Sequence, residues 1–247
     1  MSLHETLEAI SSRCKTTGKN RLPVQKDYFT LLERAITVLE HEPHFVRPPD
    51  SSGLPGGLLY LKPDIPTLVL PDLHARTDFF METMNHTLES GQRVIDSMLS
   101  GDSQVLCLGD GFHSEKRGKL RWQDAFKEYT HGYVKKKAMD AEMNESLSLM
   151  EMVMECKRAA RDNFHFLKGN HENVLNEKGN GNHPFGKFAL EGEMVKLYIR
   201  MFYGEEFLQT YALFEKSLPL FAVGGTFLAS HAEPFEAYTE EDLIETR

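Results

Sequence analysis

The stretch Phe164-His-Phe-Leu-Lys-Gly-Asn170-His171-Glu172 ends a short apolar run with side chains that bind metals and transfer protons. Two earlier stretches have the same form, Thr67-Leu-Val-Leu-Pro-Asp72-Leu-His74 and Val105-Leu-Cys-Leu-Gly-Asp110-Gly. Short apolar runs closed by Gly or Pro predict buried strands. In open α/β sheets, ligands bind at the carboxyl ends of strands, which is where these polar side chains fall. We therefore expect an α/β protein with its functional site at the edge of a sheet.

A fourth apolar stretch, residues 218–230, is followed directly by His231. The segments around the four stretches have apolar positions at helical spacing. They predict helices at 2–14 and 24–42, one or two between 79 and 99, one long helix or a helical pair over 121–161, and a helical region over 190–216. Strand, helix and strand in that order predict parallel pairing with a right-handed connection.

The composition narrows the class of protein. The chain has 247 residues, 40% of them hydrophobic and 26% charged, as in an ordinary globular protein. A net charge of -9 argues against nucleic acid as a partner, because such binding depends on neutralising phosphates. Three cysteines without a CxxC pair favour a reducing compartment. No signal peptide and no apolar run of about 20 residues is visible, so we expect a cytoplasmic protein without a membrane partner.

The polar residues that follow the strands form a set of metal ligands. Asp72 and His74 present an oxygen and an imidazole nitrogen to one cation, and Asn170 and His231 do so for a second. Asp110 lies between two glycines, and its carboxylate is suited to bridge two metals at about 3.5–4 Å. Mixed O/N ligation without cysteine favours Mn, Fe or Zn over Ca. The sequence predicts two divalent metal ions, with Mn as the expected metal.

His171 follows Asn170 directly and would point elsewhere. Because the pKa of histidine lies near neutrality, a histidine beside the metals can protonate a leaving oxygen as general acid. We assign His171, together with Asp110 and Asn170, to catalysis. Either Glu172 or Asp72 is available to orient the imidazole, and the sequence does not decide between them.

Taken together, these motifs resemble the calcineurin-like metallophosphoesterase superfamily. This superfamily includes the serine/threonine phosphoprotein phosphatases and the symmetrical dinucleoside tetraphosphatases. Its pattern is Asp-x-His, Gly-Asp, Gly-Asn-His-Glu/Asp, a histidine after a later strand, and a final Gly-His motif. The chain supplies the first four in order over residues 67–235. The resemblance implies a two-sheet sandwich flanked by helices, over residues 61–247. The helical spacing before it predicts a helical N-terminal extension over residues 1–60.

The sequence departs from the family pattern at several positions. The glycine that usually follows Asp-x-His is Ala75, and the Gly-Asp-x-x-Asp-Arg of the protein phosphatases reads Gly-Asp110-Gly-Phe-His113-Ser. The arginine two residues after Asn-His-Glu is absent. Arg76 and Arg117 are candidates to bind the phosphate in its place, or else are surface arginines. His113 is a further candidate to face the substrate.

The final Gly-His motif has no counterpart, because residues 232–247 contain no histidine. We expect the domain over 61–247 to lack its C-terminal part; the alternative is a second metal held by fewer protein ligands. The expected function is hydrolysis of a phosphate ester, on a small molecule or a phosphoprotein, by metal-activated hydroxide with a histidine general acid. The alternatives are a dinucleoside polyphosphate hydrolase and a phosphatase-like binding protein without activity.

Overall fold

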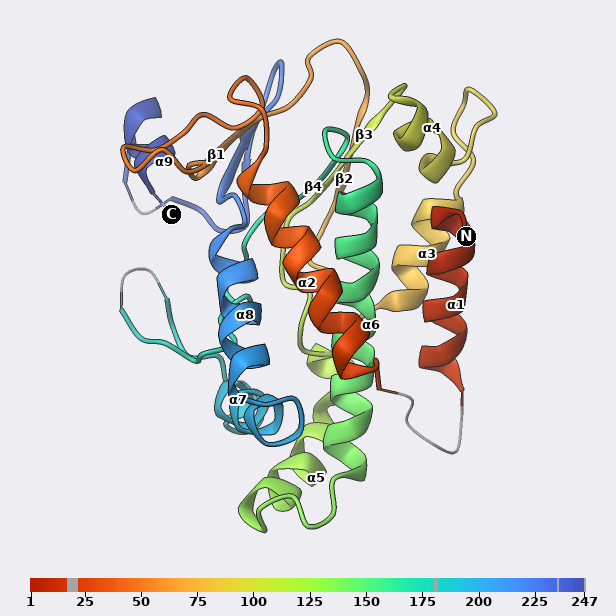
Figure 1. The fold of residues 1–247 in the computed structure, drawn as a ribbon, viewed down its shortest axis with the longest axis vertical. Coiled ribbons are helices and arrows are strands. Elements are labelled where there is room, and N and C mark those ends of the chain that lie inside the picture. Colours follow the sequence, from red (N-terminus) through yellow and green to blue (C-terminus); the bar gives the residue numbers. More distant parts are fainter. Residues whose placement is uncertain (17–21, 180–181, 235, 247) are drawn as a thin grey trace.

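The computed structural model describes residues 1–16, 22–179, 182–234 and 236–246. These residues form a mixed α/β structure with nine α-helices and two three-stranded sheets (Figure 1). The first sheet has the order β1 (Leu58–Tyr60), β5 (Phe221–Val223), β6 (Leu228–Ser230). The second has the order β2 (Thr67–Leu70), β3 (Gln104–Cys107), β4 (Phe164–Phe166). The expected α/β class is confirmed at this level.

The second sheet places the sequence motifs. Its strands are all parallel, with Leu70 opposite Cys107 and Cys107 opposite Phe166 at their carboxyl ends. The predicted parallel pairing is therefore confirmed. The polar residues that follow each strand consequently meet at one edge of the sheet. In the first sheet β1 and β5 are parallel, and β6 returns antiparallel to β5 through a tight turn.

Helices cover the second sheet and connect its strands. Their bounds are α1 (Leu3–Lys15), α2 (Gln25–Glu40), α3 (Thr77–Asn85), α4 (Val94–Ser100), α5 (Lys119–Thr130), α6 (Lys137–Ala159), α7 (Glu191–Phe202), α8 (Glu205–Lys216) and α9 (Glu240–Glu245). A short 3₁₀ helix, Glu115–Gly118, precedes α5. The region 121–161 is a helical pair, because Gly132 (φ 64°) and Tyr133 (φ 57°) adopt left-handed conformations that end one helix before the next begins.

The N-terminal helices share the main core. Helix α1 packs on α6 and α3, and α2 packs on α6 and α8. Leu7 of α1 and Leu32 of α2 are fully buried in the same apolar cluster as Phe164 of β4. The first 60 residues also contribute strand β1, which pairs with β5. Residues 17–21 of this region lie outside the described residues.

Strand β3 is buried on both faces. Val105 and Cys107 lie in the main core with the helices, whereas Leu106 joins a second cluster with Leu59 and Ala222 of the other sheet. This alternation follows from the two-residue period of a strand. The second cluster therefore connects the two sheets through apolar contact. None of the helices in the described residues combines the length and apolar character needed to cross a bilayer.

A buried charge network fixes the connection between α2 and β1. Arg47 is 1% exposed and donates to Glu42 Oε2 (3.1 Å) and to the carbonyl oxygens of Gly56 (2.6 Å) and Ser217 (2.7 Å). Lys157 of α6 donates to the second Glu42 oxygen (2.5 Å). Because a buried charge without a partner is costly, these contacts hold the proline-rich connection against α6 and the segment before β5.

Candidate metal centre

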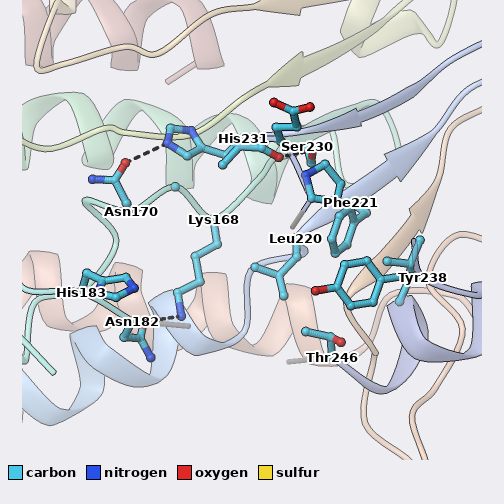
Figure 2. A pocket seen from close by; sticks show the side chains of 15 residues that line it. Lys168, Asn170, Asn182, His183, Leu220, Phe221, Ser230, His231, Tyr238 and Thr246 are labelled. Atoms are coloured by element: carbon cyan, nitrogen blue, oxygen red, sulfur yellow. Dashed lines mark hydrogen bonds between the residues drawn. The ribbon is translucent and has the colours of Figure 1, made fainter. Parts of the chain in front are cut away.

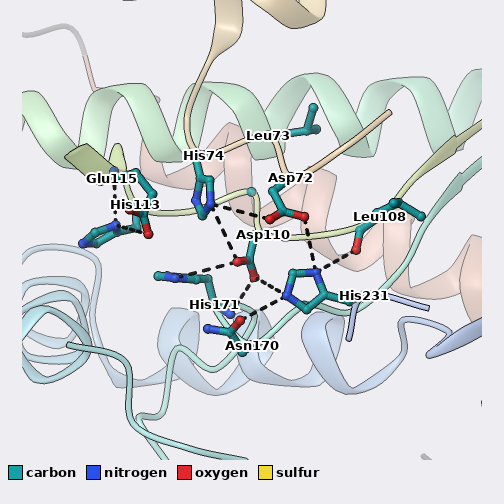
Figure 3. A network of polar contacts seen from close by, with 12 residues as sticks. Asp72, Leu73, His74, Leu108, Asp110, His113, Glu115, Asn170, His171 and His231 are labelled. Atoms are coloured by element: carbon teal, nitrogen blue, oxygen red, sulfur yellow. Dashed lines mark hydrogen bonds and ion pairs between the residues drawn. The ribbon is translucent and has the colours of Figure 1, made fainter. Parts of the chain in front are cut away.

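The loops after β2, β3 and β4 and the residue after β6 meet at one place (Figure 3). They bring together the six side chains that the sequence motifs supplied: Asp72, His74, Asp110, Asn170, His171 and His231. Five of them follow the parallel sheet, and His231 arrives from the other sheet.

Asp110 lies at the centre of this group, and its side chain is 5% exposed. Its Oδ1 is 3.4 Å from His231 Nε2. Its Oδ2 is 3.9 Å from His74 Nε2 and 3.7 Å from His171 Nε2. The two carboxylate oxygens therefore face different imidazole rings, which is the arrangement that a carboxylate shared by two cations requires.

Two glycines allow the loops after β3 and β4 to touch. Gly109 has φ 111°, and a Cβ there would lie 2.8 Å from the backbone nitrogen of Gly169. A Cβ on Gly169 would lie 2.3 Å from Asp110 Oδ1. Asp110 itself has φ 52°, an uncommon conformation for a residue with a side chain. Such strain collects at functional sites, where the surrounding structure holds it in place.

Glu172 stabilises the backbone around Asp110 through hydrogen bonds. It is 1% exposed and accepts hydrogen bonds from the backbone N–H groups of Gly169 (2.7 Å), Asp110 (2.9 Å) and Gly111 (2.8 Å). Its contacts are thus with the backbone around Asp110. Asp72, the other carboxylate considered as a partner of His171, lies instead near His74 and His231.

One group of candidate metal ligands consists of Asp72, His74 and Asp110, whose donor atoms all lie within 4.8 Å of one another. The loop that carries them is strained, with His74 at φ 42° and Ala75 at φ 55°. Ala75 occupies the position where the family pattern has glycine, and its backbone still adopts the left-handed conformation that glycine favours. The Asp72 side chain is 47% exposed, so this side of the site opens to solvent.

The second group of candidate metal ligands consists of His231, Asn170 and Asp110. Asp110 belongs to both groups. His231 Nδ1 is 3.0 Å from the carbonyl oxygen of Leu108, which can only accept, so Nδ1 carries a proton. In a neutral ring, Nε2 then presents a lone pair to Asn170 Oδ1 (3.0 Å) and Asp110 Oδ1 (3.4 Å), which are acceptors too. Three lone pairs that converge in this way form a favourable contact only when a cation lies among them or when one of the three groups carries a further proton. A backbone carbonyl that fixes the tautomer is the usual support of a metal-binding histidine.

His171 belongs to neither of these two groups, although its Nε2 is 3.7 Å from Asp110 Oδ2 and it has a donor atom within 4.8 Å of donor atoms of His74 and Glu115. Its backbone N–H donates to Asp110 Oδ1 (3.0 Å), and its side chain is 9% exposed. The ring packs against Phe185 with centroids 4.7 Å apart and edge-on to His74 at 5.4 Å. Burial, followed by the nearby His113, His74 and His231, lowers the pKa of His171 to about 3.

The electrostatics of the group suit a divalent cation. Burial, followed by repulsion from Glu172, raises the pKa of Asp110 to about 8. Burial also lowers the pKa of His74. Without a cation the fold thus disfavours the carboxylate charge and keeps the imidazole lone pairs available. A divalent cation would favour the charged form of the carboxylate and would bind the imidazole lone pairs. The oxygen and nitrogen donors suit Mn, Fe or Zn.

The three candidates for substrate binding have other contacts in this structure. Arg76 donates to the carbonyl oxygens of Asp72 and Leu73. Arg117 donates to Glu145 (2.7 Å) and lies 3.4 Å from the carbonyl oxygen of Ala75. Both guanidinium groups thus adjoin the loop after β2. Their role toward a phosphate stays a prediction.

His113 is 1% exposed and lies behind His171, with ring centroids 5.0 Å apart. It stacks on Trp122 at 4.8 Å, its Nε2 is 3.5 Å from Glu191, and its Nδ1 accepts from the backbone N–H of Glu115. It therefore supports the wall of the site, and substrate contact by this residue stays a prediction.

Two carboxylates near the site were not among the predicted site residues. Glu115 has an oxygen within 4.8 Å of donor atoms of both His74 and His171, and it begins the 3₁₀ helix that follows the loop of Asp110. Glu191, at the start of α7, is fully buried beside His113. The proximity of Glu115 to Asp110 in the sequence was a usable indication, whereas no motif surrounds Glu191.

Comparison of the chain with models of protein families and with curated proteins found no match. The residues and their geometry therefore carry the functional argument.

Proposed function

We propose that this protein is a phosphoesterase that uses two divalent metal ions. Asp72, His74 and Asp110 would hold one ion, and Asp110, Asn170 and His231 the other. When bound, the pair would supply positive charge to phosphate oxygens and make a hydroxide nucleophile available near neutral pH. Mn is the expected metal, with Fe or Zn as alternatives.

The observation that carries this proposal is the two-sided environment of Asp110. One oxygen faces His231 and the other faces His74 and His171, at distances of 3.4–3.9 Å. These separations are longer than direct hydrogen bonds and leave room for cations whose ligand bonds are about 2.0–2.2 Å. A buried carboxylate ringed by imidazoles is otherwise a costly arrangement, because burial disfavours its charge.

The protein side chains then have separate tasks. Asp110 and Asn170 fix the donor geometry, supported by Glu172 on the backbone of the loop. His171 donates a proton to the leaving oxygen, which is the oxygen that departs from phosphorus with the electron pair of the broken bond. The negative charge of a bound phosphate favours the protonated imidazole and so counteracts the burial that lowers its pKa.

The fold proposal is that of the calcineurin-like metallophosphoesterases. Two features support it: two sheets that share an apolar cluster, and metal ligands contributed by the strand ends of both sheets. Helices α4 and α6 contact the parallel sheet, and α1, α2 and α3 pack on α6, in keeping with the helical layer that the family resemblance implies (Figure 1).

The test combines metal content with turnover. The full chain is freed of metal with EDTA, reloaded with Mn²⁺, and assayed for bound metal and for hydrolysis of p-nitrophenyl phosphate. We expect Mn²⁺-dependent hydrolysis, lost in Asp110→Asn and retained in Asp78→Asn, a change on the exposed first turn of α3. Tight metal binding without turnover would instead support a binding protein. Equal metal content in the wild type and in Asp110→Asn would refute the metal centre.

A further inference from the structure

A cavity of about 340 Å³ adjoins the metal centre on the side of Asn170 and His231, which line it (Figure 2). Small-molecule sites have volumes of about 300–1,000 Å³. The cavity is thus large enough for a ligand part that extends beyond a phosphoryl group at the metals. Its two ends differ in chemistry.

The polar end is formed by Lys168, Asn182 and His183 (Figure 2). Lys168 lies two residues before Asn170, and its backbone N–H donates to the carbonyl oxygen of Pro219 (2.8 Å), which fixes its position. Its ammonium group donates to Asn182 Oδ1 at 3.3 Å. An ammonium carries three N–H donors, so this contact leaves donors for an anionic group.

The other end is apolar and aromatic. Phe221 and Tyr238 have ring centroids 6.5 Å apart at an interplanar angle of 48°, and Leu220 and Leu243 complete this wall. Tyr238 is 42% exposed, so its ring is accessible from the cavity mouth. Aromatic side chains of this kind bind planar rings by stacking.

We propose that this cavity binds the nucleotide part of a nucleoside polyphosphate. The residues beside the metal centre, the ammonium and the aromatic wall line one cavity, and a terminal phosphoryl, a further phosphate and a base are the three parts that such a cavity suits. Glu233 at the exposed rim is an acceptor for ribose hydroxyls. An aryl phosphate would fill the aromatic wall but leave Lys168 without an anion. The inference rests on the proposed function only for the position of the scissile phosphoryl group.

The reaction on ADP, the smallest such substrate, balances without a further reactant. The oxygen of water forms a bond to the terminal phosphorus, and the bond from that phosphorus to the bridging oxygen breaks. The electron pair stays on the bridging oxygen, which becomes a phosphate oxygen of AMP. The products are AMP, inorganic phosphate and the proton released by water.

Binding of the leaving group tests the cavity independently of turnover. AMP is titrated by calorimetry into the Mn²⁺-loaded full chain, with inorganic phosphate present to fill the metal centre. We expect binding that weakens about tenfold or more in Lys168→Met and in Tyr238→Ala, the loss typical of a charge-assisted contact or a stacked base. Lys127→Met and Phe45→Ala, which are exposed elsewhere, are the matched controls and should bind as the wild type does.

Turnover then separates the two proposals. For Lys168→Met, kcat/KM should fall about tenfold more on ADP than on p-nitrophenyl phosphate. Hydrolysis of p-nitrophenyl phosphate without AMP binding, or tighter binding of phosphotyrosine than of AMP, would overturn the nucleotide cavity and leave the phosphoesterase proposal intact. AMP binding that depends on Lys168, in a protein that hydrolyses no phosphate, would support the cavity and refute the phosphoesterase.

Discussion

Asp110→Asn should stabilise the metal-free protein while removing its metal site. Burial raises the pKa of Asp110 from 3.8 to about 8, so the fold favours the protonated carboxyl. In the unfolded chain the group ionises near pH 4. The wild type therefore loses stability relative to the variant as pH rises from about 4 to about 8, and the difference stays constant above that. Asparagine keeps an oxygen for the His171 N–H and never ionises.

The magnitude follows from the width of this pH window. At pH 7 the pH lies about three units above the pKa of this group in the unfolded chain. At about 1.4 kcal/mol per unit, the free energy of unfolding of the metal-free variant should exceed that of the wild type by about 2–4 kcal/mol. In a chain of this length that is an increase in Tm of about 5–15 °C. Below pH 4 both carboxyl and amide are neutral, and the two proteins should unfold with similar free energies.

The assay is urea unfolding in EDTA at several pH values between 4 and 9. Asp72→Asn is the matched control, because its side chain is 47% exposed and should change stability by less than about 0.5 kcal/mol. Saturating Mn²⁺ should reverse the order, since only the wild type gains from binding. A difference between wild type and Asp110→Asn that does not change with pH would refute the reasoning.

Three further changes test other parts of the structure. His171→Asn should keep the bound metal and lose about 10²–10⁴-fold in kcat, with the smallest loss on p-nitrophenyl phosphate; equal losses on alkyl phosphates would argue against an acid role. Glu172→Gln should bind Mn²⁺ more weakly, because one accepting carboxylate oxygen becomes an NH2 group that faces a backbone N–H donor of the Asp110 loop; unchanged metal affinity would contradict its supporting role. Glu42→Gln should cost about 3–5 kcal/mol, because a neutral amide replaces the buried carboxylate that Arg47 and Lys157 share, with kcat at 25 °C unchanged; a milder cost would show that water reaches these charges.

The sequence was sufficient to predict the strands, the parallel pairing in the second sheet and the polar residues that meet at its edge. Apolar runs such as 164–166 must be buried, and parallel strands align their carboxyl ends, so Asp72, Asp110 and Asn170 meet for local reasons. The helices were also predictable, because their apolar residues recur at helical spacing. Such patterns repeat within a segment and do not depend on distant contacts.

Contacts between distant segments were decided only by the tertiary structure. His231 reaches the site from a different sheet, and its tautomer depends on the Leu108 carbonyl oxygen, which no local pattern specifies. Glu172 binds backbone N–H groups from two loops, and His113, a residue of a polar loop, is buried behind His171 because Trp122 and Glu191 cover it. Burial and hydrogen-bond partners depend on which surfaces meet, and that is a property of the folded chain alone.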